Sequence, residues 1–198
     1  MKRSEQKATT RATILDLAAE RLRTEGLAGN GVQRLMRDLG QTHGGFYAHF
    51  PSKEALEVAA LEVAMAERAQ RLDAQGEGLT RADRRKRRAR SYLSRQHRDH
   101  PETGCPLAAL LSEAPRAAPA VRESFQAMLA AMVTDSDNPQ DPAPAPSEEL
   151  ALLALAAGGL ALARAVPDPA LSDAILAACR DAAGVLADAH ADAQGDPQ

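Results

Sequence analysis

Two short amphipathic segments meet at a glycine in residues 32–56, VQRLMRDLGQTHGGFYAHFPSKEAL. From Val32 to Leu39 the apolar residues recur at i, i+3, i+4 and i+7, which is the spacing of one helical face. Gly40 follows directly and suits the C′ position that closes a helix. Thr42 can then cap a second helix that runs from His43 to about His49. The pattern predicts two helices joined by a tight turn.

The second of these helices has two unlike sides. Phe46 and Phe50 share an apolar face at i, i+4 and are expected in the core, while the opposite side carries small or polar residues. Gly44 and Gly45 each cost a helix about 1 kcal/mol relative to alanine. That cost has a reason if the helix backbone must lie close to base edges or phosphates. The arrangement is typical of a helix-turn-helix, whose second helix enters the major groove.

Capping and breaking residues extend this pattern along the chain. A first helix is expected from about Thr10 to Glu25, and Asn30 is a plausible N-cap for the second. After Pro51, Ser52 can cap a long fourth helix to about residue 73. No segment alternates with period two, so we expect an all-α chain of about nine helices. The remaining five helices are expected at residues 80–98, 107–113, 120–133, 148–166 and 169–191. Thr80 and Asp83 are expected to form a capping box for the first of these, and Asp168 is expected to be the N-cap of the last. The proline-rich residues 135–147 are expected to form a loop.

Composition excludes several classes of protein. The chain has 198 residues, 44% of them hydrophobic, which is ordinary for a globular protein. Its longest apolar run, residues 150–163, is too short to span a bilayer, and the N-terminus lacks a signal sequence, so a cytoplasmic protein without membrane contact is expected. The two cysteines cannot form a disulfide framework and offer no zinc anchor. No metal or other cofactor is expected.

Charge and aromatic residues are unevenly distributed. Residues 1–53 carry a net charge of +4, whereas the remainder carries −7, so the N-terminal quarter is suited to a polyanion. The chain has no Trp and five Phe or Tyr residues, three of which fall within residues 46–50. A chain with few aromatic side chains that places most of them in its helix-turn-helix needs them there to hold a small helical unit rigid.

Residues 35–56 resemble the DNA-binding domain of the TetR/AcrR family of transcriptional regulators. The resemblance rests on Gly40 in the turn, on the Phe-Tyr-x-His-Phe cluster of residues 46–50 and on the Ser-Lys-Glu start of the fourth helix at residues 52–54. It implies a DNA-binding domain at residues 1–52 and an effector-binding and dimerisation domain at residues 53–198. It also implies that the last two helices pair across a homodimer, and that the protein is a regulator and not an enzyme.

The resemblance also assigns DNA contacts. Its phosphate-binding positions fall on Asn30, Thr42, Tyr47, His49 and Lys53, and its base-reading positions fall on Gln33, His43, Gly44 and Gly45. The family commonly has Thr or Ser where this chain has Gly45. Direct readout of bases must therefore depend on Gln33, His43 and Tyr47.

Cys105 is a second place where chemistry is plausible. It precedes a short predicted helix and follows His97, Arg98 and His100, an environment that can activate a thiol. The alternatives are a buried structural cysteine, a sensor of oxidants or electrophiles, a metal site with His97 and His100, and an enzyme using those histidines as a base. The buried cysteine is favoured, and no orienting acid supports the enzyme.

Three further expectations concern the C-terminal body. The basic run from Arg81 to Arg90 is expected to form a solvated helix face rather than a nucleic-acid site. The long Ala- and Leu-rich stripes of the last two helices favour a C2 dimer, with packing inside one chain as the alternative. An effector pocket, for a small apolar ligand, is expected at Tyr92, Leu110, Phe125, Met128 and Leu129.

These observations lead to a hypothesis for the whole chain. It is expected to be a homodimeric repressor that binds a palindromic operator in double-stranded DNA and is released by a small-molecule effector or by modification of Cys105. The alternative is a DNA-binding dimer without an effector response.

Overall fold

A computed structural model describes residues 3–73, 79, 81–134 and 146–193. Every regular element in these ranges is helical, as expected. Ten are α-helices, and short 3-10 turns at Leu27–Asn30, Pro101–Thr103 and Ala114–Arg116 connect some of them. The helices are α1 (Arg3–Thr24), α2 (Val32–Asp38), α3 (His43–Phe46), α4 (Lys53–Asp73), α5 (Arg81–Tyr92), α6 (Arg95–Asp99), α7 (Leu107–Leu110), α8 (Pro119–Thr134), α9 (Pro146–Ala165) and α10 (Pro169–Ala193).

The tenth helix arises because the helix predicted for residues 80–98 is broken. Its last turn is disturbed where Arg180 of α10 donates a hydrogen bond of 2.6 Å to the carbonyl of buried Leu93. Ser94 then starts α6 afresh, because its hydroxyl accepts the amide of His97 at 3.1 Å. The prediction of one continuous helix was therefore wrong.

Other helix boundaries also differ from the predicted ones. α1 begins at Arg3, well before the predicted Thr10, and α9 begins at Pro146, inside the segment expected to be a loop. Proline fits there because the first helical position needs no N–H donor. The predicted capping box at Thr80 and the expected loop over 135–145 lie outside the described residues. No helix in the described ranges is long and apolar enough to cross a membrane.

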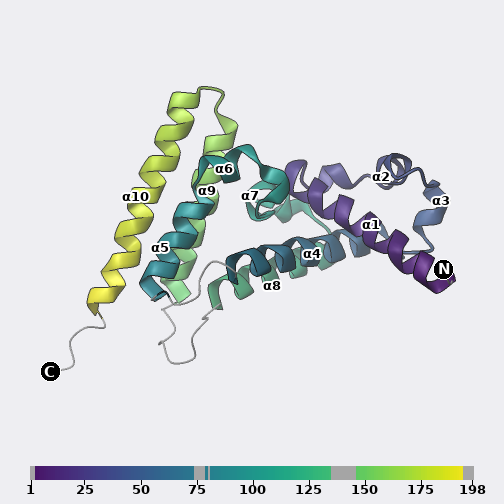
Figure 1. The fold of residues 1–198 in the computed structure, drawn as a ribbon, viewed down its shortest axis with the longest axis horizontal. Coiled ribbons are helices and arrows are strands. Elements are labelled where there is room, and N and C mark those ends of the chain that lie inside the picture. The colour runs from purple at the N-terminus through teal and green to yellow at the C-terminus, as the bar shows by residue number, and fades with distance from the viewer. Residues whose placement is uncertain (1–2, 74–78, 80, 135–145, 194–198) are drawn as a thin grey trace. The chain divides into compact units, whose positions relative to one another are not determined.

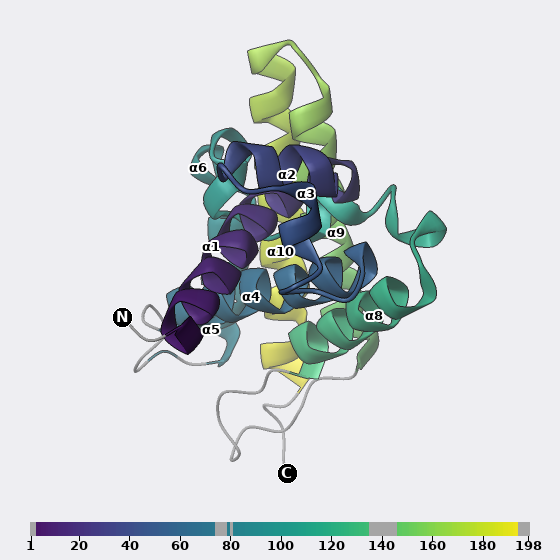
Figure 2. The same cartoon turned by 90° about the vertical axis from the view of Figure 1, so that its right-hand side faces the viewer.

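The chain divides into two compact units. The first comprises Met1–Ala69 with Pro101–Met128, and the second comprises Gln70–His100 with Leu129–Gln198. In the first unit, α1 packs on α2 and α7 and on the turns that flank them (Figures 1 and 2). Its fully buried side chains include Ile14, Leu22, Leu35, Phe46 and Leu56.

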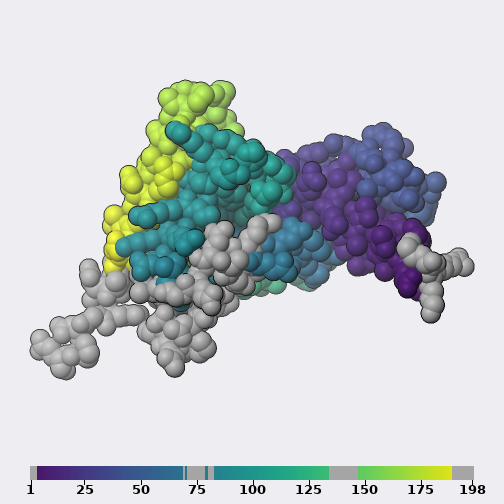
Figure 3. Space-filling model, viewed as in Figure 1, coloured from purple at the N-terminus to yellow at the C-terminus, as the bar shows by residue number. Residues whose placement is uncertain are grey.

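The second unit is built on the antiparallel pair α9 and α10, with α5 alongside both (Figure 1). Leu160 and Leu176 are buried within it. A Cβ on Gly159 would lie 2.6 Å from the Sγ of Cys179 and 3.1 Å from Leu93, so this close approach needs a glycine. The surface of α10 lies along the edge of this unit, beside that of α5 (Figure 3).

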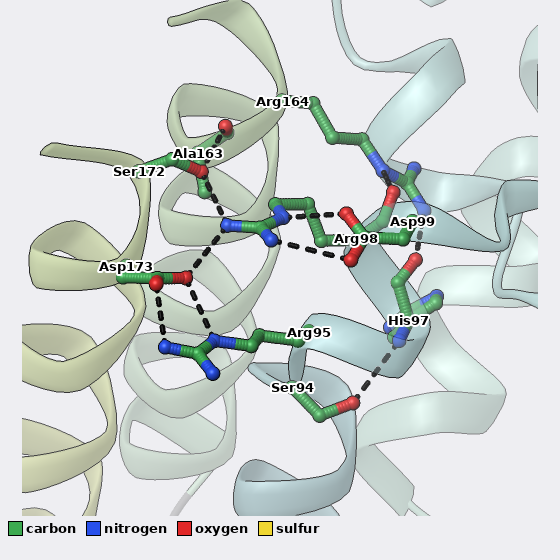
Figure 4. A network of polar contacts seen from close by, with 9 residues as sticks. All are labelled: Ser94, Arg95, His97, Arg98, Asp99, Ala163, Arg164, Ser172 and Asp173. Carbon is green, nitrogen blue, oxygen red and sulfur yellow. Dashed lines mark hydrogen bonds and ion pairs between the residues drawn. The ribbon is translucent and has the colours of Figure 1, made fainter. Parts of the chain in front are cut away.

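A polar clamp, defined here as Arg95, Arg98, Arg164, Ser172 and Asp173, ties α6 to the end of α9 and the start of α10 (Figure 4). Arg98 donates to Ser172 at 2.8 Å and to Asp173 at 2.9 Å, and Arg95 donates to Asp173 at 3.0 Å. Arg164 donates to two backbone carbonyls of α6, one of them at 3.2 Å. A helix as short as α6 has little stability of its own, so these contacts hold it in place.

The basic run of α5 also has structural contacts. Arg85 is buried and pairs with Glu149 of α9 at 2.8 Å, and Lys86 pairs with Asp188 of α10. Arg87 and Arg90, in contrast, are exposed. The expected solvated face thus covers only part of the run, and the rest connects α5 to its two neighbours.

Candidate nucleic-acid interface

The turn between α2 and α3 has the geometry that the sequence predicts. Gly40 has φ +66°, and its amide donates to the backbone carbonyl of Arg37 at 3.0 Å. The amide of Gln41 donates to the backbone carbonyl of Met36 at 2.8 Å. This is a Schellman motif, which favours glycine at that position. Thr42 then caps α3, because its hydroxyl accepts the amide of Gly45 at 3.2 Å. The chain therefore reverses within three residues and α3 starts with a side-chain oxygen at its N-terminus.

Aromatic contacts hold α3 in place. Phe46 and Phe50 are buried and lie nearly parallel, with ring centroids 5.7 Å apart, which confirms both as core residues. Tyr47 packs its ring edgewise against Phe46 at 5.2 Å and remains 58% exposed. His43, also exposed, lies edgewise to Tyr47 at 5.7 Å. Phe46 thus directs α3 so that His43 and Tyr47 lie together on its exposed side.

The two glycines of α3 have different surroundings. A Cβ built on Gly44 would meet nothing within 4 Å, so this position opens directly to solvent. A Cβ on Gly45 would lie 3.3 Å from the capping hydroxyl of Thr42. Gly44 therefore gives the helix a bare exposed backbone, while Gly45 protects the cap. A side chain at Gly45, as the family commonly has, would crowd the hydroxyl of Thr42.

Lys53 starts α4, with Ser52 accepting the amide of Ala55 at 3.2 Å as predicted. Its ammonium lies 2.9 Å from the carboxylate of Glu57. Glu57 is only 5% exposed, and burial raises the pKa of its carboxyl even though Lys53 opposes the change. The pKa of Glu54 is lowered by the backbone N–H at the start of α4 and by Ser52. The sequence reasoning missed Glu57, although its i, i+4 spacing from Lys53 was visible.

Asn30 and Gln33 differ from one another in accessibility. Asn30 is fully buried, and its amide donates to the carbonyl of Ala18 in α1 at 3.2 Å. The N-cap of α2 is Gly31, so the prediction of Asn30 as that cap was wrong. Its side chain braces α1 instead and does not reach the surface. Gln33 is exposed on α2, and His49 is half-buried after α3.

Ion pairs fix α2 against α1. Buried Arg21 of α1 pairs with Asp38 at the end of α2, and this guanidinium lowers the pKa of that carboxyl. Arg34 pairs with Glu25 and lowers the pKa of that carboxyl in the same way. Exposed ion pairs add little stability, but Arg21 is buried and needs its partner. The orientation of the helix-turn-helix therefore depends on Arg21.

Two further residues escaped the sequence reasoning. The guanidinium of Arg11 lies over the ring of Phe50, 4.8 Å from its centroid. The carboxylate of Glu113 accepts the amide of Leu27 at 2.5 Å, and it occupies the space where Gly26, with φ +70°, would carry a Cβ. The second contact joins residues 86 positions apart in sequence. It fixes the chain where α1 leads into the helix-turn-helix.

The five expected effector residues are divided between the two units. Leu110 and Met128 are buried and Phe125 is half-buried in the first unit, whereas Tyr92 and Leu129 belong to the second. The ring of Tyr92 packs edgewise on His97, with centroids 4.6 Å apart. The expectation of one pocket formed by all five residues stays a prediction.

Cys105 is 3% exposed and precedes α7, in the first unit. Its neighbours Gly104, Pro106 and Leu107 are also buried. His97 and His100, the proposed partners in a metal or enzyme site, belong to the second unit. The structure thus places the thiol in the interior, as the favoured alternative expects.

Comparisons with known proteins agree with this geometry. Residues 14–60 match the model for bacterial regulatory proteins of the tetR family. A TetR-family regulator from Cytophaga hutchinsonii superposes with a TM-score of 0.70 at 22% identity, over 91% of this chain and 96% of that one. A TetR regulator from Chloroflexus aurantiacus gives 0.73 at 21% identity over 91% and 95%, and the reduced form of E. coli NemR gives 0.69 at 21% over 89% and 96%. A search of the curated proteins finds no match.

The fold and the helix-turn-helix define an all-helical DNA-binding regulator. Residues 14–60, from α1 into α4, thus match the regulatory proteins of the tetR family, and the chain shares the fold of the TetR-family regulators on which it superposes.

Proposed function

We propose that this protein is a cytoplasmic, homodimeric repressor that binds a palindromic operator in double-stranded DNA. The observation that carries the proposal is the exposed side of α3, where a capped N-terminus, a bare glycine backbone and two aromatic side chains lie together. Helix N-termini bind phosphate, and a glycine lets the backbone approach the groove. Thr42, Tyr47, His49 and Lys53 would contact phosphates, while Gln33 and His43 would read bases.

Asn30 is left out of this interface because its side chain is buried. Lys53 remains in it because an ammonium that pairs with one carboxylate on its own helix can still meet a phosphate. Gly44 and Gly45 contribute by their lack of side chains.

Binding sites selected from random duplex DNA test the proposal. We expect a palindrome whose half-sites lie about one helical turn apart, roughly 34–36 Å, or a multiple of it. In anisotropy titrations, His43→Ala should reduce the preference for the selected site over a scrambled one by roughly tenfold. Arg122→Gln, an exposed change on α8, is the control. Equal affinity of the wild-type protein for selected and scrambled DNA would contradict the proposal.

Dimerisation is proposed through α9 and α10. Five large apolar side chains remain exposed on these helices: Leu150, Leu162, Leu171, Val185 and Leu186. A second copy of the same face would cover them in an isologous contact.

Release by an effector is the remaining part of the proposal. A small apolar ligand would bind at Leu110, Phe125 and Met128 or at Tyr92 and Leu129, and would favour a state with lower operator affinity. Modification of Cys105, the thiol that precedes α7, is a second route. Its burial requires local opening before a reagent can reach the thiol.

Cys105→Ser separates these routes. If p-benzoquinone or hypochlorite releases the wild-type protein from operator DNA but not the variant, Cys105 is the sensor. Equal release of both proteins contradicts that role. A DNA-binding dimer without effector response would show no release by the oxidants or by any member of an apolar ligand set.

A further inference from the structure

The first turns of α1 extend beyond the compact part of their unit. The helix begins at Arg3, whereas the match to the family begins at residue 14. Residues 4–9 are all exposed, so this extension buries little side-chain surface. Its exposed face is therefore available to a partner.

The helical register determines which face the extension presents. Ile14, Ala18 and Leu22 are fully buried and mark the core side of α1. Counting back from Ile14 by three and then by four residues places Arg11 and Lys7 on the same side. Glu5 is two residues before Lys7 and so lies on the opposite side of the helix. The side of α1 that is apolar within the unit thus becomes basic beyond it.

The position of Arg11 confirms this direction. Its guanidinium lies over the ring of Phe50, which ends the segment that follows α3 and precedes Lys53 by three residues. Within the described residues Arg11 has no carboxylate partner, and Lys7 has neither a hydrogen bond nor an ion pair. An aromatic ring orients a cation without neutralising it. Both positive charges therefore remain available to an anion.

We propose that Lys7 and Arg11 form an arm that binds the phosphate backbone of the same DNA duplex that α3 enters. Figures 1 and 2 place the first turns of α1 at the same end of the unit as α2 and α3. A duplex seated on α3 presents a dense row of phosphates, and unpaired cations bind these with release of counterions. The arm rests on the proposed function and would extend the interface beyond the helix-turn-helix.

Lys7→Gln is the first test, because Lys7 is exposed and the substitution leaves the core intact. We expect weaker binding to operator and scrambled DNA by the same factor, since phosphate contacts carry no sequence information. A plot of log K against log salt concentration should lose about 0.9 of slope per phosphate contact removed. The double variant Lys7→Gln/Arg11→Gln should show a larger loss of this salt slope than Lys7→Gln alone. The thermal unfolding midpoint of Lys7→Gln should equal that of the wild type.

Arg122→Gln removes an equal charge from an exposed position on α8 and serves as the matched control. If Lys7→Gln lowers the salt slope no more than Arg122→Gln, while wild-type protein still prefers its operator, the arm does not exist and the proposed function stands. If wild-type protein shows no preference for any selected site, the proposed function itself fails. A loss confined to operator DNA would also overturn the arm, because it would indicate base contacts.

Discussion

Neighbouring glycines in α3 illustrate how one residue type has two roles. Gly44→Ala adds a methyl group in open space, so the helix should gain stability, by up to about 1 kcal/mol. Operator affinity should nevertheless fall several-fold, because the methyl group lies where the backbone would meet the groove. Gly45→Ala places its Cβ 3.3 Å from the hydroxyl of Thr42, so it should not gain that stability. Thermal unfolding and anisotropy titration on the same samples measure both effects. Unchanged operator affinity in Gly44→Ala would show that α3 does not approach DNA at this point.

The residues of this site that were predictable from the sequence are those with local partners. Gly40 closes α2, and Thr42 caps α3 three residues before its partner Gly45, so spacing alone indicated both. Asn30 was misread as a cap because its partner, the carbonyl of Ala18, lies on another helix. Glu113 was missed for the same reason, since it meets Leu27 across 86 residues of sequence. Tertiary partners of this kind have no signature in spacing.

At the scale of the element, α4 carries a buried carboxylate one turn after its start. Burial raises the pKa of Glu57 above its ordinary value of 4.5, so the folded state binds its proton more tightly than the unfolded state does. The contribution of this group to stability is therefore fully present below that unfolded value and is lost as pH rises through the folded pKa. Glu57→Gln should be more stable than the wild type at pH 7, and the difference should shrink toward pH 4.5.

Urea unfolding of both proteins at several pH values measures this difference. Asp38 and Asp173, whose pKa values are lowered by arginine partners, shift the stability of both proteins equally and cancel in the comparison. A difference that does not change with pH would show that Glu57 is not the group responsible.

The short helix α6 depends on contacts outside itself. Asp173 accepts from both Arg95 and Arg98, and these arginines lower the pKa of its carboxyl. Asp173→Asn should lower the thermal midpoint and speed amide exchange in residues 95–99 several-fold. Asp181→Asn, at an exposed position of α10, should change neither. Equal exchange in the two variants would mean that the polar clamp does not hold α6.

Some helix boundaries followed local capping residues that the sequence shows. α10 begins at Pro169 because Asp168 accepts the amides of Ala170 and Leu171 at 3.1 and 3.3 Å, as its sequence predicts. The break between α5 and α6 combines a local cap, Ser94, with a distant contact, because Arg180, which binds the carbonyl of Leu93, is 87 residues away. Charged helices such as α5 are ambiguous for a related reason, since spacing does not distinguish a solvated arginine from one paired with a neighbouring helix.

At the scale of the whole molecule, the two units differ in how they use apolar residues. The first unit buries the aromatic side chains of Phe46 and Phe50 in its helix-turn-helix, whereas the second unit packs alanine and leucine side chains along α9 and α10. The boundary predicted at residue 52, between a DNA-binding and an effector-binding domain, stays a prediction, whereas the first compact unit joins residues 1–69 with residues 101–128. Chain order alone could not reveal this arrangement, because the turn Pro101–Thr103 and α7 pack against α1, and Glu113 binds Leu27 in the turn after α1.

The exposed apolar residues of α10 provide the test of assembly. Val185 is 70% exposed, and a glutamate there would bring two unpaired charges into an isologous interface. Val185→Glu should weaken the dimer by roughly 100-fold or more, because a buried charge without a partner is strongly unfavourable. Sedimentation equilibrium measures the change, and Ala127→Glu at an exposed site on α8 is the control. The monomer should retain its helical circular dichroism. It should lose the high affinity for a palindrome that the two linked helix-turn-helix units of a dimer provide. A variant that remains dimeric would show that the face containing Val185 lies outside the interface.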